Sequence, residues 1–210
     1  MASNINRAEA FSHNMVNYIL EGKKASLSLL RIAKHEYYTY THSVGTAAIG
    51  TLFANDLGLT ESDLKPFCTG TLLHDIGKIK INTDILNKKG ELTKEEFAEI
   101  QKHCEFGVQI LKEIGTDFKD EYEIILQHHE NCDGTGYPLG IKKGEIHFFS
   151  RIAHIVDVYD ALTTKRSYSD ALNSFDALKT IKDKMSNEID LDIFGKFVKF
   201  LGGSGNIRMN

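Results

Sequence analysis

The sequence predicts an all-α fold built on one domain, and three observations support this prediction. Apolar residues recur three and four positions apart in successive segments, which is the period of an amphipathic helix. Alternation of apolar and polar residues, which is typical of strands, is nowhere sustained. Only two prolines, Pro66 and Pro138, interrupt the 210 residues, so few positions oppose helix formation. This length suits one domain, or one domain with a helical extension.

The N-terminal residues 1–35 are expected to form a short helical extension. One helix is predicted over about Asn6–Leu20 and stops at Gly22, and a weaker one covers about Ala25–Ala33. Regulation and homodimer formation are the two roles that this extension could serve. The domain proper is expected over residues 36–203, followed by a flexible tail at 204–210 that is rich in glycine.

The next two helices have clear boundaries in the sequence. A helix over about Thr41–Leu57 ends at Gly58, because glycine is favoured just past a helix end. Thr60 and Asp63 then form a capping-box pattern, in which each side chain bonds the backbone amide of the other residue. This pattern predicts a helix from Leu64 to about Ile76.

A second capping-box pattern, Thr93 with Glu96, predicts one long helix that ends near Gly115. Apolar periodicity predicts four further helices, at about Tyr122–His129, His147–Leu162, Phe175–Met185 and Leu191–Leu201. The clearest loops are expected at residues 82–92 and 130–143. The second loop must turn tightly, since Asp133, Gly134, Gly136 and Pro138 fall within six residues.

Composition excludes several classes of function. Charged residues make up 26% and apolar residues 41%, which excludes disordered and collagen-like chains. The 25 basic and 29 acidic residues give a net charge of −4, so the basic footprint of a DNA-binding protein is absent. An anionic substrate must therefore be attracted by a local cluster or by metal ions.

The sequence is typical of a cytoplasmic protein. No run of about 18 apolar residues occurs, so we expect neither a membrane span nor a secretory signal. The three cysteines, Cys68, Cys104 and Cys132, lie far apart and form no C-x-x-C pair. An odd number of separated cysteines suits a reducing compartment.

Polar side chains occupy positions where the helical pattern predicts a core. The apolar stripe through Leu64, Cys68 and Leu72 continues by the same spacing into Asp75, with His74 beside it. A buried carboxylate is costly unless a cation or several donors compensate it. Asp75 is therefore expected to face a cation.

The same pattern recurs along the chain. A lone core histidine is usually structural, but five histidines and two aspartates at helix ends or on inward faces need a shared partner. These residues are His42, His74, His103, His128, His129, Asp75 and Asp157. Imidazole and carboxylate ligands without thiolates favour Fe, Mn or Zn. Seven ligands exceed the demand of one ion with an open position, so we expect two divalent ions bridged by Asp75.

The ordered motifs resemble the HD-GYP subfamily of the HD phosphohydrolase superfamily. They are YTYTHS at 38–43, LLHDIGKI at 72–79, KHCEFG at 102–107, HHENCDGTGYPLG at 128–140 and RIAHIVDVYDALTTKRSY at 151–168. The resemblance covers about four fifths of the chain. It implies an HD-domain helical bundle with a GYP loop.

The resemblance also implies how the metals are held. His42, His74, Asp75 and Asp157 would hold one ion, and Asp75 would bridge to a second ion held by His103, His128 and His129. Iron is the implied metal, with manganese as the alternative. Some relatives hold a third metal through an acidic residue before the first histidine; Tyr38 and Glu36 flank that stretch here, only Glu36 could serve, and two metals are expected.

Further residues are implied to bind substrate. Lys78 lies one helical turn after His74, so its ammonium is expected to point toward the metals and to contact phosphate. Arg166 matches a family arginine and is expected to bind the other phosphate, with Lys165 as a second cation. Gly134 and Gly136 would permit close backbone approach, and Tyr137 would either stack on a guanine or pack beneath the loop.

Two further positions bear on how the ligands and the substrate are held. Glu130 is expected to accept a hydrogen bond from a ligand histidine. Gly45 stands where many relatives have arginine, which predicts fewer phosphate contacts. The other histidines, His147 and His154 among them, are expected to be structural or exposed.

The function implied is a metal-dependent phosphodiesterase that hydrolyses cyclic di-GMP to linear pGpG, with GMP as a further product. Four alternatives stay open: a phosphodiesterase for another cyclic dinucleotide such as cyclic GMP-AMP, a non-catalytic cyclic dinucleotide receptor, a module that binds a cyclase, and, ranked lowest, a di-iron oxygenase. The GYP loop is also expected to contact a diguanylate cyclase domain.

Overall fold

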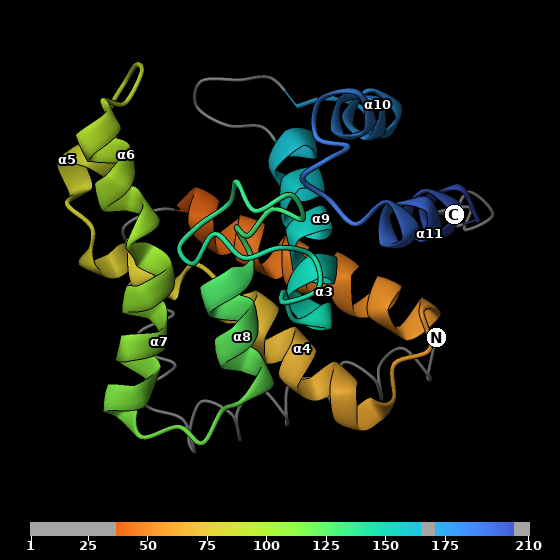
Figure 1. Ribbon diagram of the computed structural model, residues 1–210, viewed down its shortest axis with the longest axis horizontal. Helices are drawn as coiled ribbons and strands as arrows, with labels where there is room; N and C mark the ends of the chain where they lie inside the picture. The colour runs from red at the N-terminus through yellow and green to blue at the C-terminus, as the bar shows by residue number, and fades with distance from the viewer. Residues whose placement is uncertain (1–36, 165–170, 204–210) are drawn as a thin grey trace, which may run out of the picture. The chain divides into compact units, whose positions relative to one another are not determined.

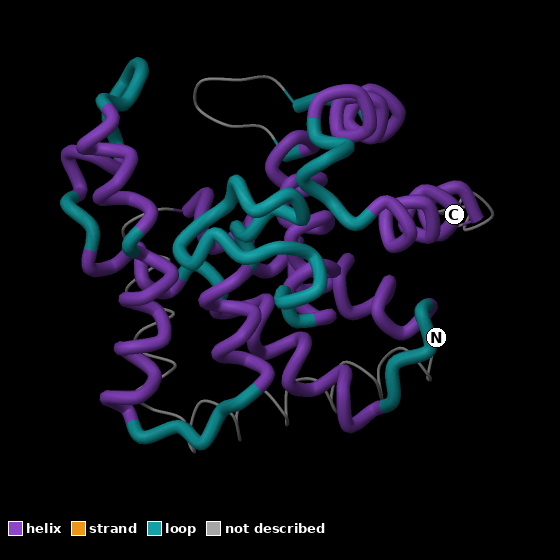
Figure 2. Tube along the Cα trace, in the orientation of Figure 1, coloured by secondary structure: helices purple, strands orange, loops and turns teal. Residues whose placement is uncertain are grey.

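The computed structural model describes residues 37–164 and 171–203, and every regular element in that part of the chain is helical (Figures 1 and 2). The predicted all-α class is therefore confirmed. The two helices predicted before residue 36, the tail 204–210, and the substrate candidates Lys165 and Arg166 lie outside the described residues. The chain divides into two units, 1–40 and 41–210, and every described element except the first turn of α3 belongs to the second.

The first two described helices are α3, Tyr37–Asp56, and α4, Glu61–Leu73. The predicted capping box starts α4, with the amide of Asp63 bonded to Thr60 Oγ1 at 3.4 Å and the amide of Thr60 to Asp63 Oδ2 at 3.2 Å. The helix ends at Leu73 rather than at Ile76. His74 and Asp75 therefore lie in the turn between α4 and the short 3₁₀-helix η1, Ile76–Lys80.

The prediction of one long helix after Thr93 is wrong, because this segment forms two helices. The second capping box starts α6, Lys94–Gln101, as predicted, but α7 begins anew at His103 and runs to Ile114. The side chain of His103 donates from Nδ1 to the carbonyl of Ile100 at 2.7 Å, so this bond competes with the backbone ladder at the break. A short helix, α5, Thr83–Leu86, also lies within the loop expected at 82–92.

The last four helices agree with prediction to within a few residues. They are α8 at Asp120–Gln127, α9 at Phe148–Thr163, α10 at Ser174–Lys184 and α11 at Leu191–Gly203. The GYP loop, residues 130–143, joins α8 to α9 without regular structure, as expected (Figure 2). None of the helices in the described ranges is both long and apolar enough to cross a bilayer.

Helix α9 lies at the centre of the apolar core, where it packs against α8, α10 and α11 (Figure 1). Phe53, Phe67, Ile155 and Phe197 are fully buried in this core. Each such side chain contributes about 1.5–3 kcal/mol by its burial. The core thereby fixes α3, α4, α8 and α9, which are the helices that carry most of the polar cluster.

A close contact between η1 and α7 brings His74 and Asp75 next to His103. A Cβ atom at Gly77 would lie 1.9 Å from the carbonyl oxygen of His103, which no side chain could accommodate. Glycine at this position therefore lets the turn after α4 touch the start of α7.

Candidate metal centre

The seven predicted ligands converge on one cluster at the C-terminal end of α4. Their positions are His42 on α3, His74 and Asp75 in the turn after α4, His103 at the start of α7, His128 and His129 at the end of α8, and Asp157 on α9. Six of the side chains are buried, and His129 is partly exposed. The cluster is thus a polar site enclosed by the core.

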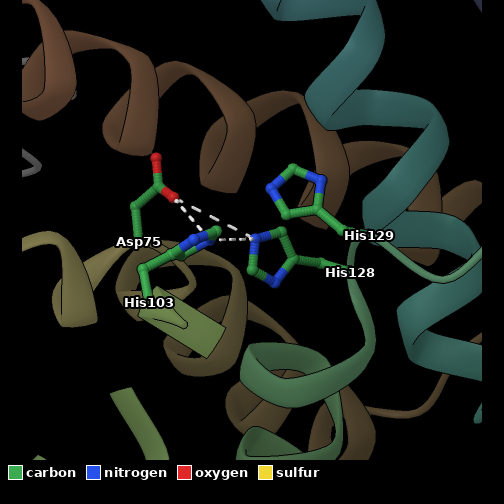
Figure 3. Close-up of side chains that lie close together, drawn as sticks. All are labelled: Asp75, His103, His128 and His129. Carbon is green, nitrogen blue, oxygen red and sulfur yellow. Dashed lines mark hydrogen bonds and ion pairs between the residues drawn. The ribbon is translucent and has the colours of Figure 1, made fainter. Parts of the chain in front are cut away.

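Asp75 lies within the cluster, and Figure 3 shows one of its carboxylate oxygens facing His103 and His128. Oδ2 lies 3.4 Å from Nε2 of His74. Oδ1 lies 3.4 Å from Nε2 of His103 and 4.0 Å from Nε2 of His128. This is the arrangement that a carboxylate bridging two cations needs.

Backbone carbonyls fix the orientation of three of the imidazoles. Each ring places Nδ1 against a carbonyl oxygen: His74 against Thr71 at 2.7 Å, His103 against Ile100 at 2.7 Å, and His128 against Ile125 at 3.0 Å. A carbonyl only accepts hydrogen bonds, so Nδ1 carries the proton in each case. In the neutral form of each ring, Nε2 then carries a lone pair toward the centre of the cluster, as in metal-binding histidines.

The ligand atoms fall into two groups that share Asp75. In the first subsite, which we define as His42, His74, Asp75 and Asp157, Oδ1 of Asp157 lies 2.8 Å from Nε2 of His42 and 3.6 Å from Nε2 of His74. The second subsite consists of Asp75, His103, His128 and His129, whose ligand atoms lie within 4.8 Å of one another.

Two buried atoms at the junction of the subsites have no hydrogen-bond partner. They are Nε2 of His74 and Oδ1 of Asp75. Such a group costs about 1–3 kcal/mol when it is left unsatisfied. Because both atoms are electron-pair donors, a cation satisfies them whereas an additional acceptor would not. The donor set of imidazole nitrogen and carboxylate oxygen therefore fits a pair of divalent ions.

The imidazole of His42 in the first subsite is held between two carboxylates. Burial alone would lower the pKa of His42, but hydrogen bonds to Asp157 and Asp160 outweigh burial and raise this pKa to about 10. Asp75 shows the opposite balance: burial would raise its pKa, but the charge of Lys78 and the nearby imidazoles holds it well below its usual range. The carboxylates of this subsite are thus ionised.

The imidazoles of the second subsite behave differently, because burial dominates. Burial lowers the pKa of His103 and holds the pKa of His128 well below its usual value. Their Nε2 atoms approach each other to 3.3 Å. Both rings are therefore neutral near pH 7, which is the form that binds a metal.

The ammonium group of Lys78 points to the cluster, as its spacing from His74 predicts. Its Nζ lies 2.6 Å from Oδ2 of Asp75, and the side chain is partly exposed. A positive charge thus lies at the edge of the first subsite, next to solvent.

Tyr137 of the GYP loop packs against the second subsite. Its ring lies 4.7 Å from that of His129 between centroids, tilted by 32°, and meets His103 edge-on at 6.4 Å. One face of the tyrosine ring is therefore covered by a predicted ligand. This contact matches the packing alternative for Tyr137, and stacking on a guanine stays a prediction.

The glycines of the GYP loop serve the loop's own turn. A Cβ atom at Gly136 would lie 2.2 Å from the amide nitrogen of Asn131, and Gly134 has a φ of +87°. The predicted close approach is thus to the chain's own backbone, while a contact with substrate stays a prediction.

The expectation for Glu130 is wrong. Its buried carboxylate accepts hydrogen bonds from the backbone amides of Leu139, Gly140 and Ile141 instead of from a ligand histidine. Three amides compensate the charge and close the loop, so a histidine partner is not needed. The backbone carbonyl of Glu130 accepts from Nδ1 of His154, which has the structural role expected of that histidine.

Sequence reasoning missed Asp160, which lies one turn after Asp157 on α9. Its Oδ2 atom is 2.6 Å from Nδ1 of His42. The i,i+3 spacing of the two aspartates could have indicated a second carboxylate on the same face of the helix. Gly45 lies beside it, because a Cβ atom there would be 2.7 Å from Oδ1 of Asp160.

The sequence matches the HD domain family over residues 24–193. It is 35% identical to a cyclic di-GMP phosphodiesterase of Pseudomonas aeruginosa, over 88% of this chain and 44% of that protein. It is also 35% identical to the 3′3′-cGAMP-specific phosphodiesterase 3 of Vibrio cholerae, over 78% of this chain and 35% of that protein. The chain thus spans less than half the length of these two relatives.

The fold resembles that of a solved structure, an HDG"Y"P protein from Bdellovibrio bacteriovorus. The TM-score is 0.66 and the identity 21%, with 97% of this chain and 65% of that chain covered. At this identity the likeness concerns the fold alone.

Proposed function

The chain belongs to the HD domain family and to its HD-GYP subfamily, and from this premise we propose that it is a metal-dependent cyclic di-GMP phosphodiesterase. The products would be linear pGpG and, by a second cleavage, GMP. One observation carries the proposal: the inward Nε2 atoms surround a carboxylate whose two oxygens face two subsites.

The first subsite would hold one cation through His42, His74, Asp75 and Asp157, and the second would hold the other through Asp75, His103, His128 and His129. Two divalent cations supply an activated water and neutralise charge on the phosphoryl oxygens. Iron is the metal we propose, with manganese as the alternative.

The ammonium group of Lys78 would assist the reaction beside the cluster. It lies at the solvent side of Asp75, where a phosphate of the substrate would enter. From there it could neutralise charge on the phosphate and donate a proton to the leaving oxygen. Because the reaction needs only water as nucleophile, no serine or cysteine is assigned a covalent role.

Base and phosphate contacts complete the proposed substrate site. Tyr137, Gly134 and Gly136 lie in the loop that packs against the second subsite, which supports a role for this loop near the substrate. Arg166 and Lys165 are proposed to bind the other phosphate, on the evidence of sequence alone. The cytoplasm is the compartment we propose, since the three cysteines suit a reducing environment.

Hydrolysis of 3′3′-cyclic GMP-AMP is the second candidate. The relative from Vibrio cholerae is named for this substrate and is as similar in identity as the cyclic di-GMP phosphodiesterase. The two activities would use the same metal cluster and differ in base contacts. A non-catalytic receptor ranks lower because such proteins often lose ligands, and the full set is present here.

Protein partners form a separate part of the proposal. Leu139 in the GYP loop is exposed, and the subsidiary role we assign to this loop is contact with a diguanylate cyclase domain. Residues 1–35 are proposed to form a helical extension to the domain at 36–203, and homodimer formation is one role for it.

The experiment that tests the proposal joins metal analysis to product analysis. The protein is loaded anaerobically with Fe(II) or Mn(II) and offered cyclic di-GMP, cyclic GMP-AMP and cyclic di-AMP, with products separated by chromatography. We expect two metals per chain and linear products from cyclic di-GMP. Asp75→Ala should abolish metal retention and activity, whereas Asp183→Ala, on the exposed face of α10, should change neither.

Three results would contradict the proposal. Full activity of the metal-free protein would refute the mechanism. Binding of cyclic di-GMP without turnover in the metal-loaded protein would favour the receptor. Oxygen consumption with an alcohol or phosphonate would favour the di-iron oxygenase.

A further inference from the structure

We propose that Asp160 is a positioning residue, which holds the imidazole of His42 so that Nε2 faces the first subsite. The inference rests on the proposed function, because it concerns how one of the two cations is held. Nδ1 of His42 lies 2.6 Å from Oδ2 of Asp160, and Nε2 lies 2.8 Å from Oδ1 of Asp157. The two nitrogens thus have separate carboxylate partners on α9, one turn apart.

The place of His42 in its helix explains why the partner of Nδ1 comes from another element. The Nδ1 atoms of His74, His103 and His128 find carbonyl groups near helix ends, where some carbonyls are not used by the helix. His42 lies in the interior of α3, where the helix uses its own carbonyls. A partner for Nδ1 must therefore come from another element, and Asp160 supplies it.

The surroundings of Asp160 fix its carboxylate in this position. The residue is only 5% exposed, so water screens its attraction for His42 weakly. Thr164 donates from Oγ1 to Oδ2 of Asp160 at 3.3 Å, which restricts the carboxylate further. The hydroxyl of Thr46 lies 3.5 Å from Nδ1 of His42, at the outer limit for a hydrogen bond. Asp160 is thus the principal partner of this nitrogen.

Gly45 provides the space that Asp160 occupies. A Cβ atom at this position would lie 2.7 Å from Oδ1 of Asp160, so any side chain would displace the carboxylate. The backbone of Gly45 does not need glycine for its conformation, since its φ is not positive. Glycine inside a helix is unfavourable relative to alanine. The close approach of α3 to α9 at this point is therefore what glycine makes possible.

The role assigned to Asp160 predicts an effect on one subsite and not on the other. Partners of this kind typically change metal affinity by about 10–100-fold when they are removed. In the second subsite, backbone carbonyls rather than Asp160 fix the rings of His103 and His128. A merely structural ion pair would instead alter the stability of the fold without separating the two subsites.

The test is a calorimetric titration of the metal-free protein with Mn(II), supported by metal analysis after gel filtration. For Asp160→Ala we expect about 10–100-fold weaker binding at the first subsite and unchanged binding at the second. At a free Mn(II) concentration that fills both subsites of the wild-type protein but only the second subsite of Asp160→Ala, the metal content should fall from two ions per chain to one. Asp160→Asn should lose less, because its amide oxygen still accepts from Nδ1 of His42.

A pair of glycine variants provides a matched comparison that keeps every ligand in place. Gly45→Ala should weaken the first subsite in the same direction as Asp160→Ala. Gly195→Ala makes the same change inside α11, where a Cβ atom meets no neighbour within 4 Å, and should leave both affinities unchanged. Gly45→Ala thus keeps the inference testable if Asp160→Ala fails to fold.

Two results would overturn the inference. One is wild-type affinity at both subsites in Asp160→Ala or in Gly45→Ala, and the other is equal weakening of both subsites. In either case two ions in the wild-type protein would leave the proposed function intact. A wild-type protein that binds no Mn(II) or Fe(II) would instead refute the proposed function, and the role of Asp160 with it.

Discussion

The two subsites are built from similar side chains in similar burial, yet the electrostatics of their histidines are opposite. In the first subsite, hydrogen bonds to Asp157 and Asp160 raise the pKa of His42 despite burial. In the second, burial outweighs the attraction of Asp75 and lowers the pKa of His103 and His128. The number of carboxylates within contact distance of an imidazole decides whether its pKa is raised or lowered.

This difference indicates how each subsite would meet a cation. A proton on Nε2 of His42 compensates the carboxylates of the first subsite in the metal-free protein, so a metal there competes with a proton. The second subsite has neutral rings whose Nε2 atoms face one another at 3.3 Å, and a metal there displaces no proton near pH 7. The first subsite is thus rich in negative charge, and the second is rich in neutral nitrogen.

Removal of one subsite at a time should have the largest effect on turnover. His128→Ala should leave one metal at the first subsite, and Asp157→Ala should leave one at the second. Each should lower turnover on the order of 10³-fold, because each metal contributes several kcal/mol and 1.36 kcal/mol corresponds to tenfold. Metal analysis and steady-state kinetics measure the two effects.

A buried histidine outside the cluster serves as the control for these variants. His154→Ala removes an equally buried imidazole on α9, which donates to the carbonyl of Glu130. It should lower stability and keep both metals. Loss of both ions from either His128→Ala or Asp157→Ala would mean that the two subsites do not bind independently.

The next effect concerns the cation that lies beside the first subsite. Lys78→Met keeps the length of the side chain and removes the ammonium group that contacts Oδ2 of Asp75. We expect about 10²-fold slower turnover, the magnitude typical of a positioned proton donor, with both metals retained. Lys80→Met, in the same 3₁₀-helix with Glu113 as partner, is the matched control. Undiminished turnover in Lys78→Met would remove this lysine from the mechanism.

Metal binding at the two subsites should depend differently on pH. Since the pKa of His42 is raised from 6.5 to about 10, this group carries a proton between these values in the metal-free protein. Affinity at the first subsite should therefore rise about tenfold or more per pH unit from pH 7 to 9, because the pKa of His74 in the same subsite is raised as well. The second subsite should be insensitive to pH over this range, because lowered pKa values keep His103 and His128 neutral.

Calorimetry with Mn(II) in buffers of different ionisation enthalpy measures the proton released. Asp160→Asn, which keeps the ligand Asp157, should flatten the response of the first subsite, because a neutral amide replaces one of the two carboxylates that raise the pKa of His42. Equal slopes at both subsites would contradict the comparison.

Local signals in the sequence predicted most of the fold. The capping boxes at Thr60 and Thr93 depend on residues three positions apart, and both are present at the starts of α4 and α6, although α4 begins at Glu61, three residues before the predicted Leu64. The break between α6 and α7 was missed because it depends on the side chain of His103, whose bond to Ile100 is visible only in the folded chain. The end of α4 was missed for the same reason, because the side chain of His74, next to Asp75, bonds the carbonyl of Thr71 at the end of that helix.

The candidate site could be predicted only as far as its motifs extend. The ordered motifs indicated which histidines and aspartates converge, although they lie far apart in the sequence. The i,i+3 spacing places Asp160 on the same helix face as Asp157, but its partner His42 could not be identified, because it lies 118 positions away and the contact depends on Gly45. Glu130 was assigned to a histidine because sequence does not show that three loop amides reach its carboxylate.

Glu130 offers the smallest and most specific test, because its buried carboxylate is compensated by the protein alone. Unlike Asp75, it accepts hydrogen bonds from backbone amides on both oxygens and leaves none without a partner. Glu130→Gln places an amide group against those donors, so we expect a loss of about 1–3 kcal/mol in the free energy of unfolding. Metal content and turnover should stay at wild-type levels, since no cation is needed there.

Denaturant unfolding measures the loss, and the exposed Glu145→Gln should change stability by less than about 0.5 kcal/mol. If Glu130→Gln also lost metal, the loop and the cluster would have to be treated as one unit, and charge compensation by amides could no longer be separated from compensation by cations.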